Sequence, residues 1–231
     1  MILAAGEGSR LRDRASSKPL CAVAGQPLID HAIERLAAAG IERAVVVTGY
    51  AADRVEAHLA SRDWPIAIDS VRTPDWTQPN GVSALAAAAS VQGAETLLVM
   101  ADHLVIPALY RRMAEAGAGP GLNLAIDRRL GHPWIDPDDV TRVRTEDGRI
   151  VAIAKHLEPY DAYDTGVFAV GRVFFETLAK LHEPSISSAV SALAKERRAI
   201  TTDCSDLGWL DVDDARALAI AEGWLSGRDH P

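Results

Sequence analysis

Short apolar runs alternate with amphipathic stretches through the first 120 residues of the chain. The runs ILA, AVVVT and TLLVMA contain no charged residue, which is typical of strands buried on both faces of a parallel sheet. Between them, apolar residues recur at helical spacing, and one such pattern ends at Gly40, a residue that favours a helix terminus. We therefore expect strands at 2–4, 44–48, 66–70 and 96–101, and helices at 27–39, 52–61, 82–91 and 106–116.

The pattern changes after residue 120, where the expected strands lie closer together, at 122–127, 140–145, 149–154 and 165–170. Glu146, Asp147 and Gly148 are expected to form a hairpin turn between two of them. Two helices follow the last strand, and a terminal helix is expected at 215–225. The sequence thus predicts an α/β fold, with a Rossmann-like, mostly parallel sheet, helices on both faces and a small antiparallel extension over one end.

Composition and charge narrow the class of protein. The chain has 231 residues, 48% of them hydrophobic, which is enough for a single domain with a substantial core. A net charge of -8 argues against nucleic acid or an anionic membrane as a general partner. Cys21 and Cys204 lie far apart without metal-ligand spacing, so we expect neither a disulfide framework nor a zinc site, and a cytoplasmic setting.

The first residues of the sequence do not have the pattern of a targeting signal. No apolar run approaches 18 residues and no charged segment precedes an apolar one at the start, so neither a membrane span nor a signal peptide is expected. The first strand begins directly at Met1, which leaves open whether further residues precede it.

A loop rich in glycine and basic residues follows the first strand. Gly6 and Gly8 allow backbone N–H groups to approach a phosphate, and Arg10, Arg12 and Lys18 add charged donors, so a polyphosphate fits this loop. The spacing of a P-loop is absent, and GEGSRL lacks the third glycine or alanine of a dinucleotide-binding loop. The alternative is a flexible, solvated loop with surface arginines.

Acidic residues follow later strands. Ligands of an open parallel sheet bind outside the carboxyl ends of its strands, and Asp102 closes the buried run TLLVMAD, where it could hold Mg²⁺ beside phosphates. The alternative role for Asp102 is to cap the next segment. In WLDVDD, Asp214 is expected to cap the terminal helix, which leaves Asp211 or Asp213 as a second carboxylate.

Taken together, these motifs resemble those of a known enzyme family. LAAGEGSRL followed by KPL, the aspartate after the fourth parallel strand and the late WLD together resemble nucleotidyltransferases that join a nucleoside triphosphate to a sugar phosphate or alcohol phosphate. PNGVSAL, MADH, IAKHL, DTGVF and WLDVDD look most like inositol-1-phosphate cytidylyltransferases, which make CDP-inositol from CTP. The resemblance implies transfer of CMP to inositol-1-phosphate with release of pyrophosphate, with residues 1–120 as the nucleotide-binding half and 121–231 as the acceptor-binding half.

The resemblance also implies roles on the nucleotide side. Arg10 and Lys18 would bind the phosphates of the nucleotide, and Asp102 with Asp211 or Asp213 would hold Mg²⁺. Four residues of the first strand and its loop would line the nucleotide, namely Ala4, Ala5, Gly6 and Gly8.

Five further residues are implied in recognising the base and the acceptor. Asn80 and Ser83 would read the cytosine, although either could instead cap the alanine-rich helix that follows. Lys155 would contact the phosphate of the acceptor and complete a catalytic set with the two cations of the nucleotide loop, whereas a lone lysine after a strand is otherwise usually solvated. Asp164 and Thr165 would face the acceptor's hydroxyl groups.

Several alternatives remain open at this stage. The acceptor could be phosphocholine or a phosphonate, and the enzyme could be a sugar-1-phosphate uridylyl- or thymidylyltransferase, although the asparagine and serine of the base segment count against this. An NAD-dependent oxidoreductase would need an acid where the second strand ends in Thr48, Gly49 and Tyr50. A nucleotide sensor without activity is the remaining class.

The sequence says less about the residues that surround these candidate site residues. Residues 127–139, with His132 and Trp134, could form an acceptor wall, but we expect an ordinary loop. His103 either orients the carboxylate beside it or only packs. Many proteins of the resembled family are joined to a membrane-embedded transferase, so we expect a separate membrane transferase here or a different acceptor, and the sequence leaves a homodimer open.

Overall fold

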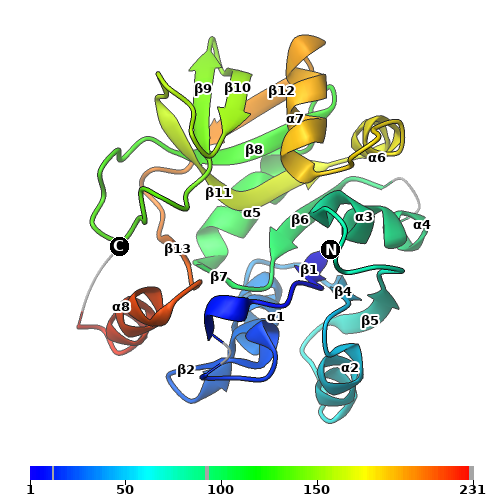
Figure 1. Ribbon diagram of the computed structural model, residues 1–231, viewed down its shortest axis with the longest axis vertical. Helices are drawn as coiled ribbons and strands as arrows, with labels where there is room; N and C mark the ends of the chain where they lie inside the picture. Colours follow the sequence, from blue (N-terminus) through cyan, green and yellow to red (C-terminus); the bar gives the residue numbers. More distant parts are fainter. Residues whose placement is uncertain (12, 92–93, 229–231) are drawn as a thin grey trace.

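Nine strands form one continuous sheet in a computed structural model of the chain, which describes residues 1–11, 13–91 and 94–228 (Figure 1). The strand order is β5-β4-β1-β6-β11-β8-β12-β10-β9. The first group comprises β1 (Ile2–Ala4), β4 (Arg43–Thr48), β5 (Ala67–Arg72) and β6 (Thr96–Met100). The second comprises β8 (Leu122–Asp127), β9 (Arg142–Glu146), β10 (Arg149–Ala154), β11 (Ala162–Val170) and β12 (Ala199–Asp203). Figure 1 shows the two groups in the lower and upper parts of the molecule, meeting at β6 and β11.

The expected α/β fold is confirmed, with one difference in the antiparallel part. The four strands of the first group are parallel, and β11 joins them antiparallel to β6, with Val167 opposite Val99. The antiparallel strands therefore continue the same sheet beside β6, and they do not lie over one end of the parallel strands. Because the last residues of β11 are buried and apolar, this strand fits inside a sheet covered on both faces.

Helices cover both faces, as predicted. The side chains of Ile2 and Ala4 pack with α1 (Leu28–Ala38), α2 (Ala52–Ala60) and α5 (Pro107–Ala116), whereas the neighbouring Leu3 packs with the opposite layer. That layer consists of α3 (Asn80–Ala86), α6 (Arg172–Leu178) and α7 (Ile186–Lys195). The alternation follows from the two-residue period of a strand. Among the described residues, no helix is long and apolar enough to cross a lipid bilayer.

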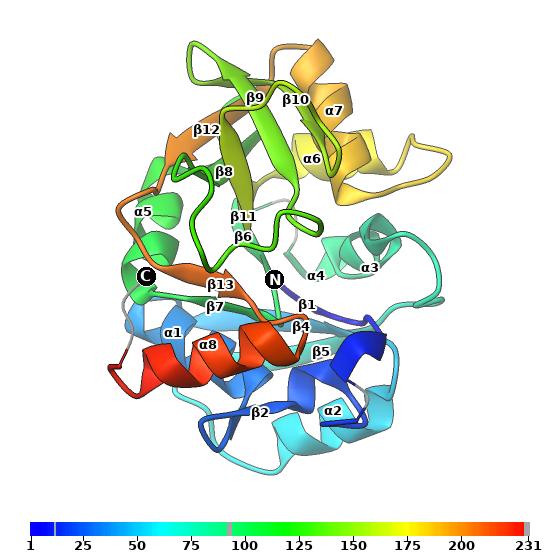
Figure 2. The same ribbon diagram turned by 60° about the vertical axis from the view of Figure 1, so that its left-hand side comes forward.

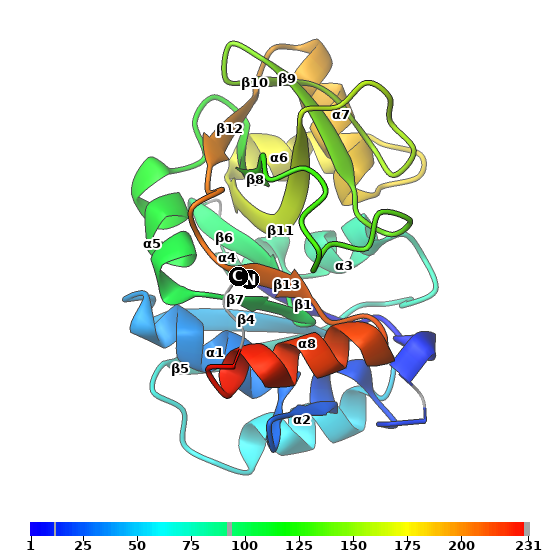
Figure 3. The same cartoon turned by 90° about the vertical axis from the view of Figure 1, so that its left-hand side faces the viewer.

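Two short strands that the sequence analysis missed lie beside the site. β7 (His103–Val105) and β13 (Trp209–Asp211) pair antiparallel, with Asp211 opposite His103. Figures 2 and 3 show this ribbon between the main sheet and α8 (Ala215–Leu225). Asp214 caps α8 as expected, since its carboxylate accepts a hydrogen bond from the Ala217 N–H at 2.7 Å.

Other boundaries differ slightly from prediction. The expected helix at 82–91 is divided into α3 and α4 (Ala88–Val91), because the backbone at Ala87 departs from helical geometry. Several short elements shape the loop after β1. They are the single helical turns Ser9–Leu11 and Lys18–Leu20 and the hairpin of β2 (Ala22–Val23) and β3 (Gln26–Pro27).

Candidate active site

Lys18 lies among three carboxylates at the carboxyl ends of the strands. Its ammonium is 2.6 Å from Asp102 Oδ2 and 3.9 Å from Asp211 Oδ1, and it also contacts the Asp213 carboxylate. The side chain is only 7% exposed. Burial alone would raise the pKa of Asp102, but Lys18 and His103 outweigh burial and hold the pKa of this carboxyl well below its usual range. Lys18 and Asp102 thus form a charged pair at the centre of the site.

The loop after β1 requires glycine where Lys18 crosses it. Gly8 has a φ of +61°, and a Cβ there would lie 2.3 Å from Lys18 Cβ, so a side chain at this position would displace the lysine. A Cβ at Gly6 would meet no atom within 4 Å, and the residue is exposed. The loop therefore holds Lys18 in place and leaves the backbone at Gly6 accessible. Arg12, also expected here, lies outside the described residues.

Asp139 joins the two other predicted cations. Its Oδ2 accepts from Arg10 Nη2 at 2.7 Å, and its Oδ1 accepts from Lys155 Nζ at 2.5 Å. Arg10 also pairs with Asp213. Arg10 follows β1 and Lys155 follows β10, so one carboxylate connects cations from the two halves of the chain. Sequence analysis missed Asp139, because no motif marks it.

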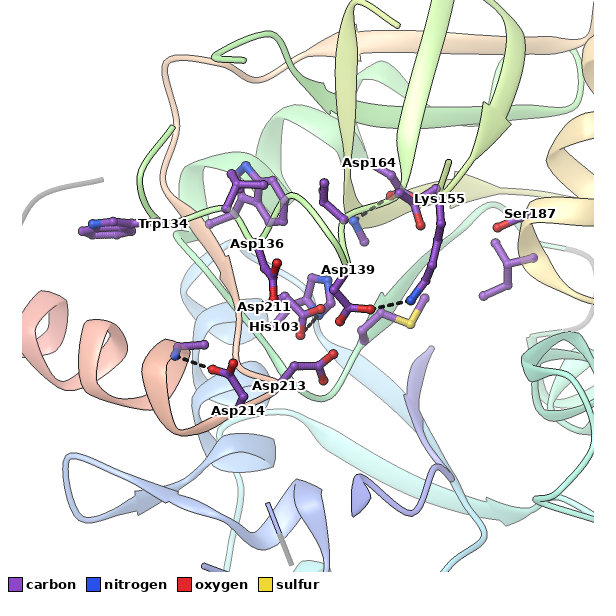
Figure 4. A pocket seen from close by; sticks show the side chains of 18 of the residues that line it. His103, Trp134, Asp136, Asp139, Lys155, Asp164, Ser187, Asp211, Asp213 and Asp214 are labelled. Atoms are coloured by element: carbon purple, nitrogen blue, oxygen red, sulfur yellow. Dashed lines mark hydrogen bonds and ion pairs between the residues drawn. The ribbon is translucent and has the colours of Figure 1, made fainter. Parts of the chain in front are cut away.

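A cavity of about 200 Å³ opens beside these charges (Figure 4). It lies between the β7–β13 ribbon, the end of β10, β11 and the loop before β9. Six carboxylate side chains line it, from Asp136, Asp139, Asp164, Asp211, Asp213 and Asp214. Carboxylates accept hydrogen bonds from hydroxyl groups and pair with ammonium groups, so a small polyol or cationic group fits the cavity.

The loop at 127–139 forms part of the wall of this cavity. Trp134, Asp136 and Asp139 all line it, which corrects the expectation of an ordinary loop. Trp134 also packs against Trp224 of α8, with ring centroids 5.6 Å apart. The sequence shows several acidic residues and a tryptophan close together in this loop. It does not show whether their side chains face a cavity or solvent.

Within residues 1–11, 13–91 and 94–228, two groups of side chains have the spacing of a metal site. They are Asp102, His103 and Asp211, and Asp139, Asp211 and Asp213, each with ligand atoms within 4.8 Å of one another. Asp211 belongs to both groups, and its Oδ1 is buried without a hydrogen-bond partner among the described residues. Burial, together with the charge of Asp102, raises the pKa of Asp211. A buried carboxylate oxygen that accepts no hydrogen bond and lies among other carboxylates fits a hard divalent cation.

His103 makes both of the contacts that the sequence left open, because it meets the Asp102 carboxylate and also packs in the site. Its Nδ1 is 2.8 Å from Asp102 Oδ1, and its ring stacks on Trp209. Burial would lower the pKa of His103, but Asp211 and Asp102 outweigh it and raise the pKa to about 9. Gly166, with a φ of +75°, allows the close approach, since a Cβ there would lie 2.5 Å from His103 Cδ2.

The predicted base-reading residues lie at the start of α3. Asn80 is exposed, lines the cavity and accepts a hydrogen bond from the Ile186 N–H at 2.9 Å, so it joins α3 to α7 and does not cap its own helix. Ser83 is buried. The two residues are therefore close along one helix but differ in access to a ligand.

Asp164 and Thr165, both expected to face the acceptor, point to different surroundings. Asp164 lines the cavity, its Oδ1 accepts from the Gly166 N–H at 2.8 Å, and burial raises its pKa to about 6. Thr165 is fully buried and its hydroxyl donates to the Ala125 carbonyl at 2.9 Å. The expectation for Thr165 is therefore corrected, because its hydroxyl is used within the sheet. Ala4 and Ala5 are buried at the end of β1.

Most of the chain is similar in sequence to known proteins. Residues 1–199 match the family described as MobA-like NTP transferase domain. A relative from Rubrobacter xylanophilus, named bifunctional IPC transferase and DIPP synthase, is 34% identical over 243 residues, covering 100% of this chain and 53% of the relative. A relative from Streptomyces rubellomurinus, named CMP-5'-(3-aminopropyl)phosphonate synthase, is 26% identical and matches 93% of this chain and 36% of its own.

Solved structures give a similar result for the fold. The structure described as the inositol-1-phosphate CTP transferase from T. maritima superposes with a TM-score of 0.86 at 21% identity, over 98% of this chain and 94% of the other. The chain spans about half the length of the curated relatives that it matches first, at 53% and 51%.

Proposed function

Because this chain belongs to the MobA-like NTP transferase domain family, we propose that it transfers CMP from CTP to inositol-1-phosphate, giving CDP-inositol and pyrophosphate. The observation that carries the proposal is the match of the whole chain to a relative named as an IPC transferase. The shape of the fold, similar to that of an inositol-1-phosphate CTP transferase, and the polyol-compatible cavity support it.

We assign the charged residues roles on the two sides of the site. Arg10 and Lys18, on the loop after β1, bind the phosphates of CTP, with the backbone from Ala4 through Gly8 along the nucleotide. Lys155, at the end of β10, binds the phosphate of the acceptor. Asp164, in the cavity wall, accepts hydrogen bonds from the acceptor's hydroxyl groups.

Mg²⁺ is the metal that we assign to the carboxylates. Asp102 and Asp211 are the residues that would hold it, because Asp211 Oδ1 accepts no hydrogen bond from the part of the chain that the structure describes, whereas the Asp213 carboxylate is in direct contact with Arg10 and Lys18. When bound, the ion would neutralise charge on the triphosphate. His103 keeps the Asp102 carboxylate oriented for this role.

The reaction needs no general base. The acceptor is a phosphate monoester with a second pKa of about 6, so its oxygen is an ionised nucleophile at neutral pH. That oxygen forms a bond to the α-phosphorus of CTP, and the bond from this phosphorus to the β-phosphate oxygen breaks, with the electron pair leaving on pyrophosphate. Arg10, Lys18 and Lys155 align the two anions and offset their repulsion.

Pyrophosphate release with Mg²⁺ tests the proposal directly. CTP, UTP, dTTP, ATP and GTP are each combined with inositol-1-phosphate, phosphocholine, 2-aminoethylphosphonate and glucose-1-phosphate. We expect release with CTP and inositol-1-phosphate, and with no other pair at a comparable kcat/KM. Preference for UTP or dTTP would overturn the proposed nucleotide, and release with CTP and another acceptor would overturn the proposed acceptor alone.

A phosphonate acceptor is the second candidate, for a specific reason. The relative named CMP-5'-(3-aminopropyl)phosphonate synthase matches 93% of the chain, and the six carboxylates around the cavity suit an ammonium group as well as hydroxyl groups. The aminoethylphosphonate arm of the assay, extended with 3-aminopropylphosphonate, distinguishes the two acceptors.

A further inference from the structure

An aromatic pair, formed by the exposed Trp76 and the half-buried Tyr50, lies at the edge of the sheet next to the loop after β1. Trp76, in the segment between β5 and α3, is 39% exposed. Its ring meets the ring of Tyr50 edge to face, with centroids 5.1 Å apart. Exposed indole surface is costly in water, so a pair held in this way is suited to covering an apolar ligand surface.

The pair is anchored directly to the end of β1. The Tyr50 N–H donates to the Ala5 carbonyl at 2.9 Å. Gly49 lets Trp76 approach the same residue, since a Cβ at Gly49 would lie 2.7 Å from Trp76 Cβ and 2.8 Å from the Ala5 oxygen. The position of the tryptophan is therefore fixed relative to the backbone that precedes Gly6.

The order of the strands shows where the aromatic pair lies relative to the charged side chains of the site. Lys18 and Asp102 mark the ends of β1 and β6, and the carboxylate-lined cavity lies beyond them toward β11 and β10. Tyr50 and Trp76 follow β4 and β5, on the other side of β1. A triphosphate bound at Lys18 with its acceptor in the cavity leaves the ends of β1 and β4 for its nucleoside.

We propose that Trp76, supported by Tyr50, is the surface on which the base of the nucleoside triphosphate stacks. This inference rests on the proposed function, in that it takes the loop after β1 as the triphosphate site. Stacking on an indole is available to every base, so Trp76 supplies affinity for the nucleoside, and the choice between bases is left to hydrogen-bonding groups such as those at the start of α3.

Binding measurements with and without a base test this role. We compare Trp76→Ala and Trp76→Phe with the unmodified protein by titrating CTP calorimetrically, and by inhibition with inorganic tripolyphosphate, which has no base. Loss of a base–aromatic stack is expected to weaken CTP binding about 5- to 100-fold in Trp76→Ala and less in Trp76→Phe. Inhibition by tripolyphosphate should stay within about twofold in both variants. Val151→Ala removes another exposed apolar side chain, on β10, and should leave CTP binding unchanged.

The outcomes separate this inference from the proposed function. Equal CTP affinity in Trp76→Ala and the unmodified protein would overturn the stacking role, as would equal weakening of CTP and tripolyphosphate, which would indicate a disturbed loop. If the unmodified protein prefers another nucleoside triphosphate, the proposed function fails, but the same comparison with that nucleotide still tests Trp76. Quenching of tryptophan fluorescence by the nucleotide should also be smaller in Trp76→Phe.

Discussion

Every cation that we assign to a phosphate already has a carboxylate partner in the free protein. Arg10 and Lys155 are 50% and 55% exposed, so their ion pairs with Asp139 contribute little and exchange easily for a phosphate. Lys18 is different, because at 7% exposure it would be left as a buried charge if its carboxylates moved away. We therefore expect Lys18 to keep Asp102 while the two outer cations change partners.

Replacement of Asp102 by asparagine tests the centre of the site. The amide keeps the shape of the side chain but removes the charge that faces Lys18 and, in our proposal, Mg²⁺. We expect kcat to fall at least about 100-fold, and the Mg²⁺ concentration for half-maximal activity to rise. Far-UV circular dichroism should be unchanged, since the side chain is 29% exposed.

Asp147→Asn serves as the control for that substitution. It makes the same charge change at an exposed turn where the backbone has a φ of +49°, which asparagine tolerates. Asp147→Asn should retain full activity. Activity of Asp102→Asn equal to that of the control would contradict the metal role.

The partly buried carboxyl of Asp164 predicts a pH-dependent stability. Burial raises its pKa to about 6, above the ordinary value of 3.8, so the folded state binds this proton more tightly than the unfolded state. The stabilisation of the folded state by this proton is complete below about pH 4 and is lost as pH rises through 6. Asp164→Asn removes this loss while its amide oxygen can still accept from Gly166.

Thermal melts at several pH values check the Asp164 prediction. We expect Asp164→Asn to match the unmodified protein near pH 4 and to be more stable by about 1–2 kcal/mol at pH 7.5. A stability difference that does not change with pH would exclude the titration of Asp164 as its source. In our proposal the same variant also loses affinity for the acceptor.

At the scale of elements, the loop before β9 connects the two sides of the site. Through Asp139 it holds Arg10 of the nucleotide loop and Lys155 of β10 with the two oxygens of one carboxylate. A phosphate bound between these cations must displace that carboxylate. The loop is therefore both a wall of the cavity and a competitor of the substrates for the same two side chains.

Asp139→Asn tests this competition. The amide removes the negative charge, so Arg10 and Lys155 are freer to bind phosphate, and we expect pyrophosphate to bind about 2- to 10-fold more tightly by calorimetry. Asp138→Asn makes the same charge change one residue away, at an exposed side chain, and should change binding by less than twofold. Weaker pyrophosphate binding in Asp139→Asn would show instead that Asp139 assists the anion, for example by holding the cations in place.

The elements also show what the sequence could predict. Apolar runs and helical periodicity located every strand of the main sheet except β12, and most helices, because burial on one or two faces imposes those patterns. The sequence analysis missed β12, which pairs parallel with β8. The pairing of β7 with β13 was not predictable, since each has three residues and their partners are more than 100 residues apart in the chain. Thr165 was misassigned because neighbouring strand residues face opposite sides, so only one of Asp164 and Thr165 can reach the cavity.

At the scale of the whole molecule, the two expected halves share one sheet. β6 belongs to residues 1–120 and β11 to residues 121–231, and the two strands pair through four residues each. The helix layer crosses the same boundary, because a Cβ at Gly81 of α3 would lie 2.3 Å from the Pro184 carbonyl oxygen. Asn80 adds its hydrogen bond to the first N–H of α7. The site lies along this boundary, with the proposed nucleotide cations on one side and Lys155 on the other.

We therefore predict that the two halves unfold as one cooperative unit. Urea denaturation followed by far-UV circular dichroism and by tryptophan fluorescence should give a single, coincident transition. Gly81→Ala should lower the stability by about 1–3 kcal/mol, because the added methyl group meets backbone that cannot move without disturbing α7. Since the sheet transmits this loss, both probes should shift to the same lower urea concentration. Two separate transitions, or a shift in one probe alone, would mean that residues 1–120 and 121–231 are independent domains, and the site would then depend on how they dock.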